Sequence, residues 1–587
     1  MNAGKQKGFN GDAQGRMGDG HVNVGLILAA IPQGNTFQVV NGVDLGKVQV
    51  DGDLGRIFAG DVFSTPAIES LVVRSLGRLG SSTQETGGNT VSLVLGPVNN
   101  LIVGGNFAGT FKVIGDIFGS IRNLQIGGAL LGGTEDQSGR IEFTGKLRNG
   151  YIGSVVGGEG DDSGTIIGQF GSIGALRIGG AVTGGSGVGS AFISAQTIQS
   201  LTVGGLTGGV GSKSGTVLAS NLEKMVVTRN LIGGAGESSG EIFADTSIGS
   251  LRIGGELRGG SGDNSGLIGT ELGVGVSSIS IFGSIIGGSG KSSGAILTGG
   301  FISSMTTGAV IGGAGQGSGA IHASSIRQLN VFGNVEGGSG KDSGGISAAK
   351  SLNAVHVHGS ILGGDSAVGE ALDNSGYVIA PRIGSLTVNG DLRSGHDNGT
   401  GLSDSGTIGA SKWIGAVHIR GSVIGNEDLA AVISAAGTAS RPAIRSLQID
   451  GAARFAQILA GYRGDEAVNA DARIGTVKIG GDMRSSSIIA GVDAGTDGVF
   501  GTNDDTLIGG AGTTDAANST SKIARIIIGG TVETGTTSAG IEAQFLKSLR
   551  VGASDVALNN GAGNDTDRAR ELAANSNIHV FELPLPA

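Results

Sequence analysis

A short pattern of alternating apolar and polar positions recurs along most of the chain. A small or polar residue precedes an apolar, a polar and a second apolar or threonine residue, and glycine often follows. The clearest copies are Ala175–Ile178, Ser200–Val203, Lys224–Val227, Ser250–Ile253, Ser278–Ile281, Ser304–Thr307, Gln328–Val331 and Ala354–Val357. Their first apolar positions lie 25, 24, 26, 28, 26, 24 and 26 residues apart. Such a period predicts a repeat architecture in which each unit buries its apolar face against its neighbours.

One repeat divides into three short strands separated by glycine-rich turns. In the copy that starts at Ser250, the predicted strands are Ser250–Ile253, 256–258 and 267–270. Leu251 and Ile253 should point inward and Arg252 outward, because successive side chains of a strand alternate between its two faces. Three strands and three turns in about 25 residues are typical of one coil of a parallel β-helix. We therefore predict an all-β, right-handed parallel β-helix.

The spacing of the copies divides the chain into four parts. Residues 1–40 read as a polar lead-in with an N-terminal cap, and 41–485 as the repeat array. Within the array the spacing lengthens to 30 or 31 residues after residue 385, which predicts insertions in loops on one side. Residues 486–522 read as a loop insertion. Residues 523–587 should form the last coils and a C-terminal cap, with a helix at 567–574 and a strand at 578–582.

A wide turn with the sequence G-G-x-G-x-x-S-G recurs at the same period. Its copies include 157–164, 259–266, 287–294, 312–319 and 337–344. They share features with a calcium-binding nonapeptide, but the sixth position is Asp, Asn, Ser, Gly and Asp in turn, and the period is 25 rather than 9. We expect a stacked, solvated turn rather than a ladder of metal ligands.

Composition excludes several classes of site. The chain has 119 glycines among 587 residues and no cysteine, so disulfides and cysteine-ligated metals are absent. A formal net charge of −10 disfavours nucleic-acid binding, which needs a basic surface. The sequence contains no apolar run of about 18 residues, so it does not predict a membrane-spanning segment. The first residues lack the apolar segment of a signal peptide, and we expect the chain to be a piece of a longer exported product with its leader upstream.

The best candidate metal site lies in the loop insertion. Asp493, Asp497 and Asp504 occupy positions 1, 5 and 12 of a loop with Gly498 at position 6, which is similar to the spacing of an EF-hand calcium loop. The carbonyl of Val499 and the carboxylate of Asp505 complete the candidate ligand set.

The candidate loop also departs from the EF-hand pattern. Gly495 stands at position 3, and the shorter Asp504 replaces glutamate at position 12. A structural calcium ion and a plain acidic, glycine-rich turn both fit this sequence.

The outward positions of the main strand supply no acid for catalysis. They read Gln125, Arg177, Thr202, Val226, Arg252, Ser280, Thr306, Asn330, His356, Thr387, His418, Gln448 and Lys478. Glycoside hydrolysis needs two carboxyl groups on one patch. The carboxylates that come closest to such a patch in the sequence lie in the longer coils, at Asp365, Glu370, Asp373, Asp391, Asp397 and Asp404. We expect His356 and His358 to be surface residues, since no third metal ligand accompanies them.

The alternation of S-L-x-[VI]-G-G strands with G-G-S-G-x-x-S-G turns resembles the glycine-rich β-solenoid repeat proteins of bacterial cell surfaces. These are similar in style to autotransporter passenger domains and filamentous-haemagglutinin-like adhesins. The stretches 41–55 and 493–505 also look like segments of large exported bacterial proteins. The resemblance implies export and a structural or adhesive role, with glycans or other cell-surface molecules as partners.

Three functional hypotheses follow. The first is a non-enzymatic extracellular or cell-surface rod with a structural or adhesive role. The second is a polysaccharide lyase or hydrolase on a parallel β-helix, because fold alone does not decide function. The third is a calcium-dependent binding module that uses the loop at Asp493. The sequence leaves the oligomeric state open.

Overall fold

The computed structural model describes residues 21–32, 39–40, 42–86, 88–271, 273, 275–366, 372–398, 401–438, 440–516, 519–533, 540–566 and 579–585. The described chain is all-β, 1% helical, and its parallel strands stack as a β-solenoid of about 19 turns with a spacing of about 26 residues. This confirms the predicted fold class. Most of the predicted lead-in, the predicted helix at 567–574 and Glu370 lie outside the described residues.

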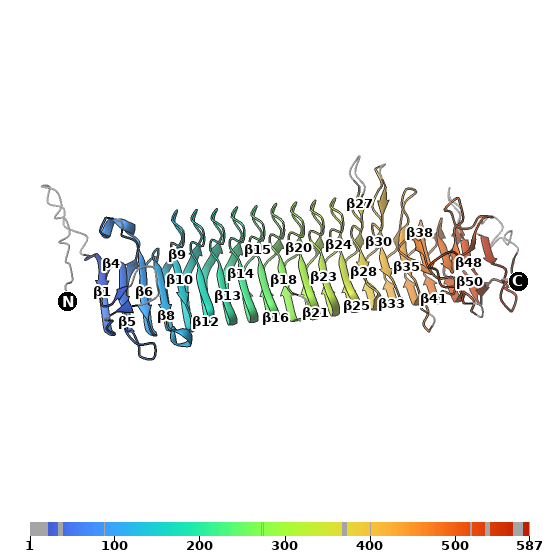
Figure 1. Ribbon diagram of the computed structural model, residues 1–587. Helices are drawn as coiled ribbons and strands as arrows, with labels where there is room; N and C mark the ends of the chain where they lie inside the picture. The colour runs from blue at the N-terminus through green and yellow to red at the C-terminus, as the bar shows by residue number, and fades with distance from the viewer. Residues whose placement is uncertain are drawn as a thin grey trace. The chain divides into compact units, whose positions relative to one another are not determined.

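The chain forms two compact units, Met1–Ser280 and Ile281–Ala587. In the first unit, each coil contributes one long strand that pairs in parallel with the long strand of the next coil. These strands are β4 (Leu45–Ala59), β5 (Ile68–Leu76), β7 (Val98–Val103), β9 (Ile121–Leu131), β11 (Lys146–Val156), β12 (Ile166–Thr183), β13 (Ile193–Thr207), β14 (Val217–Val227) and β16 (Ile242–Ile253) (Figure 1). Shorter strands complete the coils, at β1 (Val24–Leu28), β6 (Val91–Leu95), β8 (Thr110–Ile114), β10 (Arg140–Phe143), β15 (Leu231–Ile232), β17 (Leu257–Arg258) and β18 (Ile268–Thr270).

The second unit repeats this plan, and its main strands shorten from β29 onward. They are β21 (Ile296–Thr307), β23 (Ile321–Val331), β25 (Ile346–Val357), β29 (Arg382–Val388), β33 (Trp413–Ile419), β36 (Ile444–Ile449), β41 (Arg473–Ile479), β46 (Lys522–Ile528) and β50 (Leu549–Val551). Two-residue strands follow them, including β22 (Val310–Ile311), β24 (Val335–Glu336), β26 (Ile361–Leu362), β30 (Leu392–Arg393), β34 (Val423–Ile424), β37 (Ala453–Arg454), β42 (Met483–Arg484) and β47 (Val532–Glu533). A third side carries β28 (Val378–Ile379), β32 (Ile408–Ala410), β35 (Ala431–Ala435), β38 (Ala456–Ala460), β43 (Ser487–Ala490), β48 (Gly540–Ala543) and β52 (His579–Glu582).

Equivalent side chains stack in ladders along each unit. Leu201 pairs with Met225, and Met225 pairs with Leu251 on the following coil. All three side chains are buried, whereas Arg252 is exposed, so the predicted alternation of inward and outward positions is confirmed. The core of each unit is therefore a narrow column of apolar ladders, in which one side chain contacts the equivalent one in the next turn.

The wide turn is ordered around a buried serine. Its seventh position is fully buried at Ser163, Ser265, Ser293, Ser318 and Ser343. In the copy at 259–266, the Ser265 hydroxyl accepts a hydrogen bond of 3.0 Å from the amide of Gly260. The same bond occurs at 2.9–3.0 Å in the other four copies. We expected a solvated turn. At the seventh position the structure differs, because the buried serine hydroxyl closes the turn from inside.

The variable sixth position has a conformational explanation. Asp162, Asn264, Ser292, Gly317 and Asp342 all have a positive φ, between 52° and 65°. Asn, Asp and Gly enter this left-handed region more readily than other residues. The residue at this position is therefore selected for its backbone conformation, and its carboxylate, where present, is not required for the turn.

Two glycines of the wide turn are imposed by the distance between coils. A Cβ atom added at Gly234 would lie 2.1 Å from the carbonyl oxygen of Gly209 in the preceding coil. At Gly236 it would lie 2.2 Å from the carbonyl oxygen of Gly211. Real Cβ atoms do not approach backbone oxygen so closely, so stacking of the turns excludes any side chain at these positions.

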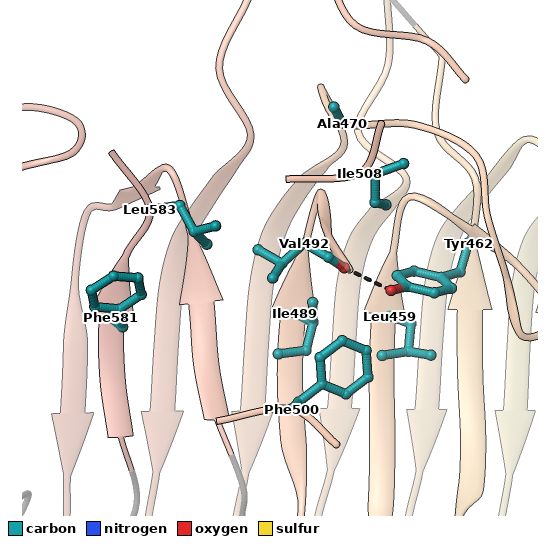
Figure 2. Packing of buried hydrophobic residues seen from close by; sticks show 9 residues of the cluster. All are labelled: Leu459, Tyr462, Ala470, Ile489, Val492, Phe500, Ile508, Phe581 and Leu583. Atoms are coloured by element: carbon teal, nitrogen blue, oxygen red, sulfur yellow. Dashed lines mark hydrogen bonds between the residues drawn. The ribbon is translucent and has the colours of Figure 1, made fainter. Parts of the chain in front are cut away.

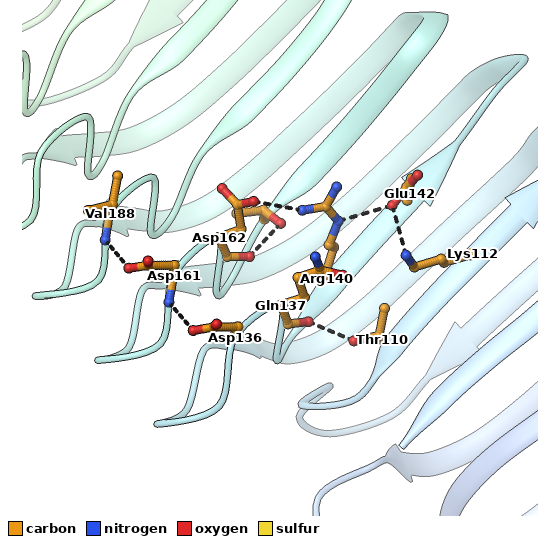
Figure 3. A network of polar contacts seen from close by, with 10 residues as sticks. Thr110, Lys112, Asp136, Gln137, Arg140, Glu142, Asp161, Asp162 and Val188 are labelled. Atoms are coloured by element: carbon orange, nitrogen blue, oxygen red, sulfur yellow. Dashed lines mark hydrogen bonds and ion pairs between the residues drawn. The ribbon is translucent and has the colours of Figure 1, made fainter. Parts of the chain in front are cut away.

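Polar side chains of the first unit connect adjacent turns (Figure 3). The Asp136 carboxylate accepts the amide of Asp161, and the Asp161 carboxylate accepts the amide of Val188 in the next turn. Beside them, Arg140 pairs with Glu142 at 3.1 Å and with Asp162 at 3.2 Å. Acidic side chains in these turns therefore bond the protein itself.

An apolar cluster covers one side of the last coils of the second unit (Figure 2). Phe500, from the predicted loop insertion, packs there with Leu459, Ile489 and Val492. The Tyr462 hydroxyl donates a 2.7 Å hydrogen bond to the carbonyl of Val492. The insertion is thus anchored on the coils by buried side chains. Among the described residues we find no helical segment with the length and apolarity that a membrane crossing requires.

The stacking constraint predicts the effect of adding one methyl group. Gly234→Ala should destabilise the first unit by about 1–3 kcal/mol or more, because its Cβ meets a backbone atom that cannot rotate away. Thermal and urea unfolding of the intact chain measure this change. Gly46→Ala is the matched control, since a Cβ at Gly46 meets no heavy atom within 4 Å. Equal effects of the two substitutions would contradict the constraint.

Candidate binding groove

The inward ladder of the first unit is interrupted at one coil. Gly150 of β11 stands in register between Leu124 of β9 and Leu176 of β12, at a position that is apolar in the neighbouring coils. A Cβ at Gly150 would lie 2.7 Å from a methyl carbon of Leu176. The neighbouring leucine therefore occupies the space that a side chain at position 150 would take, and Gly150 is half-buried.

A hollow of about 660 Å³ lies over this interruption. We name it the Tyr151 groove and define it by the residues that line it. They are Asn100, Ile102, Asn123, Leu124, Gln125, Asn149, Gly150, Tyr151, Ala175, Leu176, Arg177, Ser200 and Thr202. They come from neighbouring main strands of one unit, so the groove crosses five successive coils.

Tyr151 is the aromatic side chain of the groove. It stands in register between Gln125 and Arg177, and 42% of its surface is exposed. An exposed tyrosine offers an apolar ring and a polar hydroxyl without a large loss of side-chain entropy on binding. The side chain is thus placed where a ligand lying across the strands would contact its ring.

The polar side chains of the groove fall into two sets. Asn123 donates a 3.0 Å hydrogen bond to Asn100, and Asn100 donates to the carbonyl of Glu69 at 3.2 Å, so these two are held by the protein. In contrast, Gln125, Asn149 and Arg177 form no side-chain hydrogen bond or ion pair with any other described residue. Their donors and acceptors remain available to a ligand.

The groove presents neutral hydrogen-bonding groups and one cation to a ligand. Arg177 is the only charged residue that lines it, and no aspartate, glutamate or histidine does. The lining residues supply amides, hydroxyls and one guanidinium, which form hydrogen bonds without changing protonation.

The sequence did not predict this groove. It placed Gln125, Arg177 and Thr202 on the outer face, and all three line the groove. Tyr151 was missed because Asn149–Ile152 has glycine where the pattern requires an apolar residue. The spacing of the neighbouring copies indicates a coil between them, because the apolar positions 124 and 176 lie 52 residues apart, which is two periods of 26.

The five predicted calcium ligands lie in one hairpin of the second unit. β44 (Val492–Asp493) pairs with β45 (Thr506–Leu507), and the candidate residues lie within or between these strands. The Asp504 carboxylate accepts hydrogen bonds from the amides of Thr496 and Asp497 and from the hydroxyl of Thr496. Together with the bond from Thr502, these lower the pKa of Asp504 well below its usual range.

The other carboxylates of the hairpin also bond nearby amides. Asp505 accepts from Gly501 and Thr502, Asp497 accepts from Val499, and Asp493 accepts from Gly495. No group of three or more His, Asp or Glu side chains in the described residues is arranged to hold a metal ion. The calcium site therefore stays a prediction from residue spacing.

The acidic residues of the longer coils occupy more than one corner. Asp391 lies before β30, where its carboxylate accepts the amide of Ser422. Asp365 follows β26 and accepts the amide of His396, and Asp397 follows β30 and accepts the amide of Leu402. Most of this acidic set therefore bonds the protein's own turns.

Asp373 and Asp404 are brought near each other by the stacking of two wide turns, in which Asp373 pairs with Ser403. A 2.7 Å ion pair with Lys341 and a bond from Ser403 lower the pKa of Asp373. Burial, together with Asp465 and Asp373, raises the pKa of Asp404. The pKa values of Asp373 and Asp404 are thus shifted in opposite directions.

His356 and His358 stack with a ring-centroid distance of 4.0 Å, and His358 stacks on Phe332 at 4.9 Å. His356 also contacts the Asn389 side chain at 3.2 Å. Both imidazoles therefore lie on the surface in an aromatic stack, in agreement with their predicted outward positions.

Comparison with protein-family models, curated proteins and solved structures finds no match to this chain. The structure itself identifies the fold of the chain as a β-solenoid of repeating coils.

The calcium prediction has a direct test. Calcium should raise the melting temperature of the intact chain and chelator should lower it, because an ion at the hairpin of Asp493–Asp505 would bind only the folded state. Asp504→Asn should remove this calcium-dependent shift. A melting temperature that is the same in calcium and in chelator would reject the prediction and leave a hydrogen-bonded acidic turn.

Proposed function

We propose that this protein is a non-enzymatic, extracellular or cell-surface β-solenoid with a structural or adhesive role, and that it binds glycan chains through the Tyr151 groove. The observation that carries the proposal is the exposed Tyr151 ring among the uncommitted side chains of Gln125, Asn149 and Arg177.

The chemistry of a sugar fits this combination of groups. A pyranose ring presents a face of C–H groups and a rim of hydroxyls. The Tyr151 ring can contact the C–H face, while amide and guanidinium groups bond the hydroxyls. Because the groove crosses five coils, it suits several sugar units of an extended chain better than a small compact ligand.

Support for a surface location comes from the sequence. The repeated strand and wide-turn motifs resemble those of bacterial cell-surface solenoids, and the absence of cysteine is common in long exported repeat proteins. A solenoid also displays many copies of similar outward positions on a fixed backbone, which is useful for a spacer or an adhesive surface.

A polysaccharide-active enzyme is the alternative function, and the pair Asp373 and Asp404 favours it. One carboxyl with a raised pKa and one with a lowered pKa match the general acid and the ionised partner of a glycosidase. Against this, Asp373 is already engaged by Lys341 and Ser403. We therefore rank binding above hydrolysis.

Substitution of the aromatic ring tests the binding proposal. Against a panel of neutral and acidic polysaccharides, Tyr151→Ala should weaken binding of the best ligand by about tenfold or more, which corresponds to a loss of about 1.4 kcal/mol. Phe170→Ala is the matched control, because Phe170 is an exposed aromatic residue of β12 outside the groove. Affinity and melting temperature should be unchanged in the control.

The same incubations discriminate the alternative. No glycan binding, or equal binding by the wild type and Tyr151→Ala, would overturn the groove as the binding site. New reducing ends or unsaturated products that depend on Asp404 would overturn the non-enzymatic role. Glycan binding by the wild type that is weakened in Tyr151→Ala, without release of products, supports the proposal.

A further inference from the structure

A second hollow, of about 490 Å³, lies on the main strands of the second unit. Its floor includes Gly384 of β29 and Gly415 of β33, which stand at equivalent positions in adjacent coils. A Cβ at Gly415 would lie 2.3 Å from the carbonyl oxygen of Gly384. Coil stacking thus excludes side chains from this floor and keeps the hollow open.

Trp413 and two arginines form the walls. The Arg441 guanidinium lies over the Trp413 ring, with its central carbon 5.0 Å from the ring centroid. Arg445 of β36 projects from the position adjacent to Gly415 in the next coil. A planar ring and two planar cations therefore border one open space. We name it the Trp413 site.

The cations of the Trp413 site are not neutralised by neighbouring acids. Neither Arg441 nor Arg445 forms an ion pair with a carboxylate in the part of this unit that the structure describes, and nor does Arg382, which stands beside Trp413 in register. The strands β29, β33, β36, β41 and β46 contain no aspartate or glutamate. The same strands carry Arg382, Arg445, Arg473, Lys478, Lys522 and Arg525. These strands therefore carry only cationic charged side chains, on a chain whose net charge is −10.

The geometry selects a ligand that has both a ring and an anionic group. Guanidinium groups bind carboxylate and sulfate oxygens with two parallel hydrogen bonds, and an indole ring stacks on an apolar ring face. An acidic sugar, with a carboxylate or sulfate on a pyranose ring, supplies both in one unit. A polyphosphate chain suits the site less well, because it has no ring to stack on the indole of Trp413.

We propose that the Trp413 site binds acidic polysaccharides, with a sugar ring against Trp413 and its carboxylate or sulfate held by Arg441 and Arg445. The site lies in the other unit and shares no residue with the Tyr151 groove, so it is tested independently of the proposed function. The Trp413 site would select acidic glycans by their charge, whereas the lining of the Tyr151 groove carries a single cation.

The chain provides its own reporter, because Trp413 is its only tryptophan. Selective tryptophan fluorescence of the intact protein should change in a saturable way on titration with oligogalacturonate or heparin oligosaccharide. It should stay constant with neutral dextran. The carboxylated and sulfated probes distinguish which acidic group the arginines prefer.

Substitution of Arg445 tests the anion contact. Arg445→Gln should raise the half-saturation concentration for the better acidic probe by about tenfold, as expected for loss of a charge-assisted hydrogen bond. Arg445→Lys should restore only part of the affinity, since it keeps the charge and loses the paired geometry. Arg463→Gln is the control, an exposed arginine of the same unit that pairs with Glu466 away from the hollow. Melting curves check that each variant is folded.

Three outcomes would overturn the proposal. They are a constant fluorescence with both acidic probes, equal affinities of the wild type and Arg445→Gln, and a tighter response to single-stranded DNA than to either acidic glycan. A saturable response that is lost with Arg445→Gln and kept with Arg463→Gln supports it.

Discussion

The distance between coils at the wide turns is the constraint on which the rest of the structure depends. Backbone of one turn rests on backbone of the previous one so closely that Gly234 and Gly236 have no space for a Cβ atom. The buried hydroxyl of Ser239 then closes the turn by accepting the amide of Gly234 at 3.0 Å. Because these contacts recur in every regular coil, they fix the period, and the period brings the apolar side chains into continuous ladders.

The same constraint explains where the two candidate sites arise. In a solenoid, the backbone repeats and the outward side chains change, so a site is made by local substitution on a fixed frame. The Tyr151 groove lies where Gly150 replaces an inward apolar residue. The Trp413 site lies over Gly384 and Gly415, where the close stacking of coils leaves no space for a side chain. Both hollows are lined by residues of successive coils, so each offers contacts to a polymer ligand that crosses the strands.

Sequence reasoning succeeded where one physical rule dominates. Alternation placed Leu251 inward and Arg252 outward, and the period predicted parallel stacked coils. The wide turn was harder, because its seventh-position serine is polar and yet fully buried, as at Ser265. Its burial depends on a hydrogen bond to an amide of the same turn, which residue patterns do not display.

The candidate sites were less predictable than the fold. Tyr151 follows a glycine that breaks the repeat pattern, and only the doubled spacing around it indicated a hidden coil. The approach of Arg441 to Trp413 depends on the path of the loop that precedes β36, so no spacing rule predicts it. Conversely, the spacing of the Asp493–Asp505 carboxylates suggested metal ligands, while the structure shows each of the four aspartates bonding a nearby amide.

Amide hydrogen exchange of the wide turns in the first unit tests the central claim most directly. The account predicts that the amides of Gly209, Gly234 and Gly260, which donate to buried serine hydroxyls, exchange as slowly as the amides of β14 and β16. They should be far slower than those of the exposed loop 61–65. Exchange of the three glycine amides at the rate of that loop would show that the turns are loose, and would contradict a fold held by their stacking.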